Sequence, residues 1–196
     1  MFELAEGSGG ETAMALVSTI AHDGNGGVAD AFADDAGVNS WCAARFSDFT
    51  PRSSAQAERL RALRFAARSA FAATVSPHPP SRVERQQRMS DAEAASVLQA
   101  AITALRLQPT VAIDDSGVRR GFQTAAQDQK LIEGVLALAV VEFLTGPLAA
   151  RLRSCQAPRC VRYFVQDHGR QQWCKTSCGN RARAARFASQ HRPDPT

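Results

Sequence analysis

The 196-residue sequence lacks several features that would assign it to a familiar class of protein. Its longest apolar run, around Leu136, is interrupted by Glu142, whereas a membrane-spanning helix needs about 20 apolar residues. The first residues are acidic, and no basic segment precedes an apolar one as in an export signal. We therefore expect a cytoplasmic protein with no membrane association. Lysine is also scarce, because Lys130 and Lys175 are the only two.

Patterns typical of enzymes are missing as well. The sequence has no glycine-rich phosphate loop, no serine nucleophile elbow and no histidine pair at metal-ligand spacing. The histidines lie in expected loops or in the tail: His22, His78, His168 and His191. None of them has a recognisable acid–base partner. We expect that the protein is not an enzyme.

The charges that are present are unevenly distributed. Hydrophobic residues make up 44% of the chain and charged residues 21%, which is typical of a globular protein. The net charge is −7 over residues 1–50 and +8 over residues 151–196, although the whole chain carries only +4. A strongly basic end favours a polyanionic partner, and a solvated basic tail without a partner is the alternative.

The first three quarters of the chain predict a helical domain over residues 1–148. Apolar residues recur there at three- and four-residue spacings, the pattern of amphipathic helices. A strand, a turn and a second strand interrupt this pattern at residues 110–122 and predict one β-hairpin. The expected helices cover residues 11–20, 38–46, 51–75, 90–107 and 127–144.

Local signals mark the ends of some of these helices. Thr50 and Pro51 predict a capped helix start, and Ser90 opens a capping box. Residues 77–88 are polar and proline-bearing, so we expect a linker. Trp41 is expected in the core. The arginines of the 51–75 helix are expected to form a solvated face: Arg59, Arg61, Arg64 and Arg68.

Four of the five cysteines fall within 24 residues, in the pattern C-x4-C, thirteen residues, C-x3-C. Two close pairs joined by a hairpin-length spacer are the arrangement that a tetrahedral zinc site requires. Four thiolates leave no open coordination position, so we expect one structural Zn²⁺. An iron–sulfur centre or a redox disulfide is the alternative. The expected ligands are Cys155, Cys160, Cys174 and Cys178.

The residues around these cysteines predict a small module over residues 149–196. Residues 159–165 and 171–174 are expected to pair as strands around a turn, and strong helix formers follow Cys178. The turn that holds the first cysteine pair, residues 155–160, is called the knuckle below. The order of knuckle, hairpin and helix is treble-clef-like or zinc-ribbon-like. We expect Asn180 to cap the helix and Arg181 to pack on the site. Phe164, Trp173 and Phe187 are the expected small core.

The segment from Trp173 to Arg181, WCKTSCGNR, resembles the signature of CGNR zinc-finger proteins. Members of that family carry an N-terminal helical domain called ABATE, which is assigned to stress-induced transcription regulation. Residues 14–19, Trp41 and residues 60–64 are similar to the matching motifs of that domain. The chain departs from the family at Ser18, where Asn is usual, and at Gln171–Gln172, where two arginines are usual.

The resemblance implies zinc binding by the four cysteines and a DNA-binding, transcription-regulating role, with the helical domain sensing a small-molecule effector or forming a homodimer. Arg183 and Arg186 are three residues apart and share a helix face, so both can reach phosphates. Arg162 and Arg170 enlarge the basic surface. The alternative function is a zinc-stabilised protein–protein interaction module that does not bind DNA.

Overall fold

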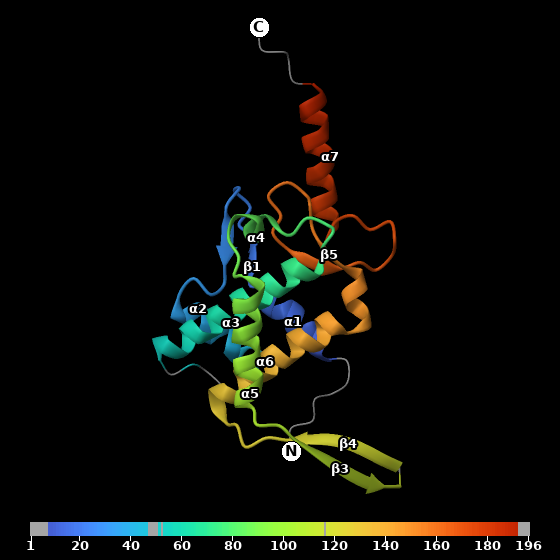
Figure 1. The fold of residues 1–196 in the computed structure, drawn as a ribbon. Helices are drawn as coiled ribbons and strands as arrows, with labels where there is room; N and C mark the ends of the chain where they lie inside the picture. Colours follow the sequence, from blue (N-terminus) through green and yellow to red (C-terminus); the bar gives the residue numbers. More distant parts are fainter. Residues whose placement is uncertain (1–7, 47–50, 52, 116, 192–196) are drawn as a thin grey trace.

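Four helices, α1, α3, α5 and α6, enclose the main hydrophobic core of the protein (Figure 1). The structure is a computed structural model that describes residues 8–46, 51, 53–115 and 117–191. α1 (Ser8–Val17) packs along α6 (Asp128–Thr145), and α5 (Asp91–Ala104) lies against α3 (Ser54–Thr74) and α6. The mainly helical class predicted from the sequence is confirmed.

Side-chain caps and apolar spacing explain where these helices lie. The Ser53 hydroxyl accepts from the Gln56 N–H and begins α3; the expected cap, Thr50, lies outside the described residues. The capping box at Ser90 is confirmed, because its hydroxyl and the Glu93 carboxylate accept from each other's backbone N–H. Gly134 allows α6 to approach α5, since any β-carbon there would collide with the Leu105 side chain.

The helix predicted over residues 11–20 ends earlier, because residues 20–22 form a strand instead. β1 (Ile20–His22) pairs antiparallel with β2 (Val28–Asp30) across the glycine-rich turn. β3 (Gln108–Asp114) pairs with β4 (Gly117–Gln123), as expected. The expectation of a single hairpin in the helical part was therefore wrong.

The remaining helices are short except for the last. α2 (Asp35–Ala43) carries Trp41, which is buried as predicted. α4 (Arg82–Gln86) lies within the segment expected as a linker, and the 3₁₀ helix η1 (Pro147–Arg151) follows α6. α7 (Thr176–Gln190) extends away from the body (Figure 1). No helix in the described ranges combines the length and the apolar character needed to cross a lipid bilayer.

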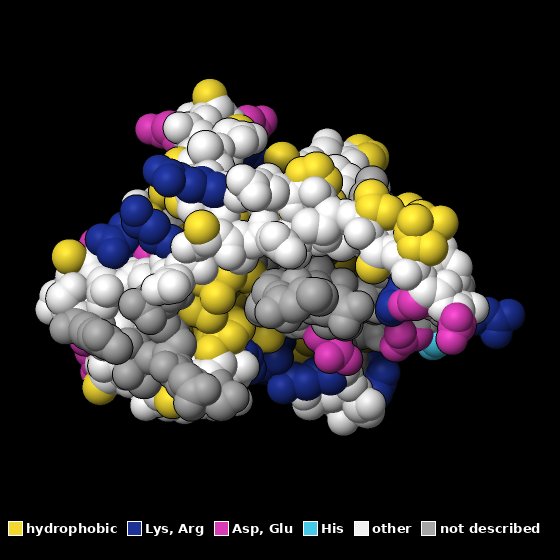
Figure 2. Space-filling model, turned by 90° about the horizontal axis from the view of Figure 1, so that it is seen from below, with side chains coloured by type: hydrophobic (Ala, Val, Ile, Leu, Met, Phe, Trp, Pro, Cys, Tyr) yellow, Lys and Arg dark blue, Asp and Glu magenta, His cyan; other side chains and the backbone are white. Residues whose placement is uncertain are grey.

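The β3–β4 hairpin lies at the end of the molecule opposite to α7 (Figure 1). Val111, Ile113 and Val118 are 71–77% exposed there. They share one face of the hairpin, because Ile113 is paired with Val118 and Val111 lies two residues before Ile113. Seen from this end, the molecule shows hydrophobic side chains at its surface (Figure 2).

The arginines of α3 do not form the solvated face predicted from the sequence. Arg59 is exposed, but Arg64 is only 7% exposed and Arg68 is fully buried. Each guanidinium meets a carboxylate: Arg59 pairs with Glu133, Arg61 with Asp35 and Glu58, Arg64 with Asp30, and Arg68 with Glu84. The sequence pattern missed these pairs because every partner except Glu58 is distant in the chain.

Arg68 joins the helical part to the cysteine-containing part. Its guanidinium donates to Glu84 at 2.6 and 3.0 Å, to the Val17 carbonyl at 2.5 Å and to the Val161 carbonyl at 3.0 Å. Tyr163 also donates to Glu84, at 3.0 Å, and its ring packs in the main core. Residues 152–165 are therefore anchored in the helical body by packing and by a buried polar network.

Candidate metal centre and basic surface

The first pair of cysteines lies in the connection between two short strands. β5 (Leu152–Ser154) pairs with β6 (Tyr163–Val165), and the Cys155 N–H donates to the Arg162 carbonyl at 2.9 Å to extend the pairing. Arg159 has a φ of 66°, a left-handed conformation that helps the chain to turn back before Cys160. The predicted strand at residues 171–174 does not form, because β6 takes β5 as its partner.

The second pair lies at the beginning of α7. Cys174 precedes the helix, and Cys178 lies in its first turn, where its N–H donates to the Lys175 carbonyl at 3.0 Å. Backbone N–H groups and the helix dipole at this end favour negative charge on sulfur. The predicted placement of this pair at a helix N-terminus is confirmed.

The four sulfur atoms converge on one centre and lie within 4.8 Å of one another. Cys174 and Cys178 are 3.5 Å apart, and Cys160 lies 3.8 Å from each of them. In a tetrahedral site with Zn–S bonds of about 2.3 Å, neighbouring sulfurs lie about 3.8 Å apart. The spacing fits one Zn²⁺, and these distances are well above the value of about 2 Å for a disulfide bond.

Hydrogen bonding among the thiols shifts their ionisation. The bond with Cys155 is the main cause that lowers the pKa of Cys160 to about 2, and the same bond raises the pKa of Cys155 to about 11. Hydrogen bonds from Cys155 and Cys160 raise the pKa of Cys174 above its ordinary value. Zinc binds cysteine as thiolate, so binding of the ion to this cluster would release the protons of the remaining thiols.

The surroundings of the cluster are apolar and nearly closed. Cys155, Cys160 and Cys178 are buried together with Ala157 and Phe164, and Trp173 packs against them. Arg181 donates to the Cys178 sulfur at 3.3 Å, as expected of a residue that packs on the site. This arrangement suits a structural metal rather than a catalytic one.

Two residues of the module differ from their expected roles. Phe187 is 64% exposed and stacks on His191, so it does not belong to the small core. Asn180 lies inside α7 and accepts a hydrogen bond from Arg183, whereas the N-cap position is Lys175. Asn180 cannot cap the helix because α7 begins at Thr176, four residues before Asn180.

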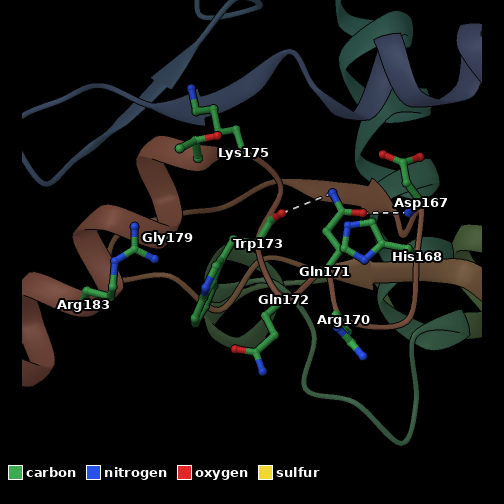
Figure 3. Close-up of a pocket in the computed structure, with 10 residues that line it drawn as sticks. Asp167, His168, Arg170, Gln171, Gln172, Trp173, Lys175, Gly179 and Arg183 are labelled. Carbon is green, nitrogen blue, oxygen red and sulfur yellow. Dashed lines mark hydrogen bonds between the residues drawn. The ribbon is translucent and has the colours of Figure 1, made fainter.

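The structure brings together two of the four arginines predicted to bind DNA. Arg170 and Arg183 line an open pocket of about 320 Å³ beside the start of α7 (Figure 3). Arg186 is exposed further along α7, and Arg162 is half-buried directly before β6. The pocket is lined by Asp167, His168, Arg170, Gln171, Gln172, Trp173, Lys175, Thr176, Gly179 and Arg183.

Gln171 has a structural role in this pocket. Its side chain accepts from the Asp167 N–H at 2.6 Å and donates to the Trp173 carbonyl at 3.3 Å (Figure 3). Lys175 also lines the pocket and was not among the predicted DNA-binding residues. Its position directly after Cys174, in an otherwise lysine-poor chain, was the one signal that could have identified it.

The fold and the cysteine cluster define a helical protein with a C-terminal four-cysteine zinc finger. Two family models match the chain: ABATE, described as "Putative stress-induced transcription regulator", over residues 10–147, and the CGNR zinc finger over residues 151–191. The protein therefore belongs to the ABATE family and carries a CGNR zinc finger that can hold one Zn²⁺. A comparison with curated proteins gives no match.

Proposed function

We propose that the protein is a transcription regulator that binds DNA through its zinc finger and senses a small effector through its helical part. Zinc would supply no reactive position; bound by four thiolates, it holds the knuckle and the start of α7 together. The proposed contacts are made to phosphates by side chains on the finger: Arg162, Arg170, Arg183 and Arg186, with Lys175 added from the structure.

The observation that carries this proposal is that several cationic side chains of the finger are not neutralised by a carboxylate. Within the described residues, the side chains of Arg162, Arg170, Lys175 and Arg186 make no ion pair and no hydrogen bond. Asp167 is the only carboxylate between residues 151 and 191. The arginines of α3, in contrast, are neutralised by carboxylates. Cations held on a folded surface without partners are the groups that neutralise nucleic-acid phosphates.

The shape of the finger suits a polyanion that extends over its surface. Arg170, Lys175 and Arg183 border one pocket, and the pocket also contains the indole of Trp173 (Figure 3). From Arg183 to Gln190 every residue of α7 is exposed. A free helix of this kind can enter a groove while the groups around the pocket contact the backbone.

The test is the affinity of the zinc-loaded protein for a random-sequence DNA duplex, measured by fluorescence anisotropy across salt concentrations. Wild-type protein should bind in the micromolar range or tighter at low salt, and the affinity should fall steeply as salt rises. The double variant R183A/R186A should bind more weakly and reduce the slope of log K against log [salt] by about 2, since each phosphate contact contributes about 0.9.

The matched control is R59A/R88A, which removes the same charge from exposed positions on the helical body. It should bind DNA as the wild type does, with an unchanged slope. If both double variants lost the same DNA affinity, the loss would follow from net charge alone, which would contradict the proposed contacts. No binding at any salt would overturn DNA binding and favour the protein–protein interaction module.

A further inference from the structure

A second pocket, which shares no lining residue with the pocket of the finger, lies where the end of α1 meets β1, β2 and α2. Its volume is about 420 Å³, within the range of small-molecule sites. The residues that line this helical-domain pocket come from four elements and the turns between them: Ala15, Ser18, Thr19, Ala21, Ala29, Asp30, Ala31, Trp41 and Arg45. The pocket exists because four of these side chains are alanines.

The walls are apolar, with a few polar groups at defined places. The Trp41 ring provides a flat aromatic surface and is itself buried against Phe32, with ring centroids 5.4 Å apart. The Thr19 hydroxyl is committed to the Leu16 carbonyl at 2.7 Å. The Ser18 hydroxyl makes no hydrogen bond within the described residues, so it is free to meet a ligand.

The two charged groups of the pocket differ in how they are compensated. Burial by itself would raise the pKa of the Asp30 carboxyl. The carboxylate accepts hydrogen bonds from both terminal nitrogens of Arg64 and from the Phe32 N–H, and these outweigh burial and hold the pKa below its ordinary value. Arg45 lies over the Trp41 ring, 4.6 Å from the centroid, and makes no ion pair within the described chain. The uncompensated charge of the lining residues is therefore positive.

We infer that the helical-domain pocket binds a small organic carboxylate, whose apolar body packs against the alanines and Trp41 and whose charge is met by Arg45. A guanidinium already held on an aromatic ring has lost part of its rotational freedom, which favours charge-assisted hydrogen bonds. Ser18, which also lines the pocket, adds a hydroxyl donor. A phosphorylated or dianionic ligand fits less well, because Arg45 is the one unpaired cation among the described residues that line the pocket.

The pocket is connected to the finger through one buried side chain. Arg68 donates to the carbonyl of Val17, directly before Ser18, and also to the carbonyl of Val161, which lies between Cys160 and Arg162. A ligand that shifts the end of α1 acts on the same guanidinium that holds the knuckle. This role as an effector site rests on the proposed DNA-binding function, whereas binding of the carboxylate does not.

Benzoate is a suitable probe, because it combines a carboxylate with a compact apolar body, and benzamide is its neutral match in shape. Trp41 and Trp173 are the two tryptophans, so the variant W173F leaves Trp41 as the reporter of fluorescence. Benzoate should change this fluorescence saturably, and benzamide should bind about tenfold more weakly. Isothermal calorimetry on the wild-type protein provides a measurement without substitution.

Two variants decide between the pocket and unspecific binding. R45Q keeps a long polar side chain but removes the charge, and it should weaken benzoate about tenfold while leaving benzamide unchanged. A15L fills the pocket and should abolish binding of both probes. The control R106Q alters an exposed arginine elsewhere and should have no effect. Equal affinity for the two probes, or unchanged benzoate affinity in R45Q, would overturn the inference.

The effector role is tested separately by repeating the DNA titration of the wild-type protein with saturating benzoate. A change in DNA affinity that is absent in R45Q supports coupling between pocket and finger. An unchanged affinity would overturn the effector role, although carboxylate binding would stand. If DNA does not bind at all, the proposed function fails, while the fluorescence result still decides the nature of the pocket.

Discussion

At the residue scale, the metal centre depends on all four sulfurs, because three thiolates leave zinc an open position on a nearly buried site. We predict that C178S will be purified without its zinc equivalent, as measured by elemental analysis of metal per protein. C42A is the control and should retain zinc. Cys42 lies in the helical core, where burial raises its pKa to about 11. Full zinc content in C178S would contradict the ligand set.

Asp30 gives a second prediction at this scale, concerning pH. Its pKa is below 3.8 in the folded protein, so the carboxylate stabilises the fold above that range and this contribution is lost as pH falls through the folded value. D30N should therefore lower the free energy of unfolding by about 1 kcal/mol at neutral pH, allowing for solvent screening.

The measurement is urea denaturation of wild type and D30N between pH 3 and pH 7. The difference between the two proteins should shrink toward acid pH. Zinc release at low pH affects both proteins alike, so it drops out of the comparison. A difference that stays constant with pH would show that Asp30 acts through shape rather than charge.

Single residues also show what the sequence could reveal. The cysteine spacing identified all four sulfurs, because ligands of a zinc finger are constrained to close pairs along the chain. The burial of Arg64 and Arg68 was not predictable, since their partners Asp30, Glu84 and Val161 are brought together only by the fold. Arginines spread over several faces of a helix predict exposed side chains, whereas Arg68 is buried here and pairs with the buried carboxylate of Glu84.

At the scale of elements, strong local signals were reliable and short pairings were not. The capping box at Ser90, the apolar α6 and the β3–β4 turn each involve residues close in sequence, and each appears in the structure. β5 and α4 were missed, because three- and five-residue elements carry too little periodicity. The strand β5 forms because β6 returns to it across the knuckle, which no local pattern indicates.

The β3–β4 hairpin permits a prediction about an element that packs mainly on itself. The triple variant V111T/I113T/V118T should change the free energy of unfolding by no more than about 0.5 kcal/mol, since these side chains are already exposed in the folded protein. By comparison, L136A in the core should cost about 2–5 kcal/mol. Chemical denaturation measures both, and a large loss in the triple variant would show that the hairpin is covered in solution.

At the scale of the whole molecule, the two family regions share one core. Leu152 and Tyr163 belong to the finger region, yet both are buried among helices of the body, and the Tyr163 ring packs on Phe71 with centroids 5.4 Å apart. R68M should lower stability by about 3–5 kcal/mol, because Glu84 would remain as a buried charge without its cation. Denaturation of R68M/E84Q should recover part of that loss; no recovery would contradict an electrostatic origin.

The shared core predicts that zinc and the helical body stabilise each other. Removing zinc with a chelator should release the knuckle and thereby loosen Leu152 and Tyr163, so unfolding of the α-helical signal should move to lower temperature as one transition. The measurement is circular dichroism during heating, with and without chelator. C178S should already melt at the lower temperature and be insensitive to chelator. If the body instead kept its melting temperature while only a small part of the helical signal was lost, the finger would be an independent appendage, and no effect of the helical-domain pocket could reach it through Arg68.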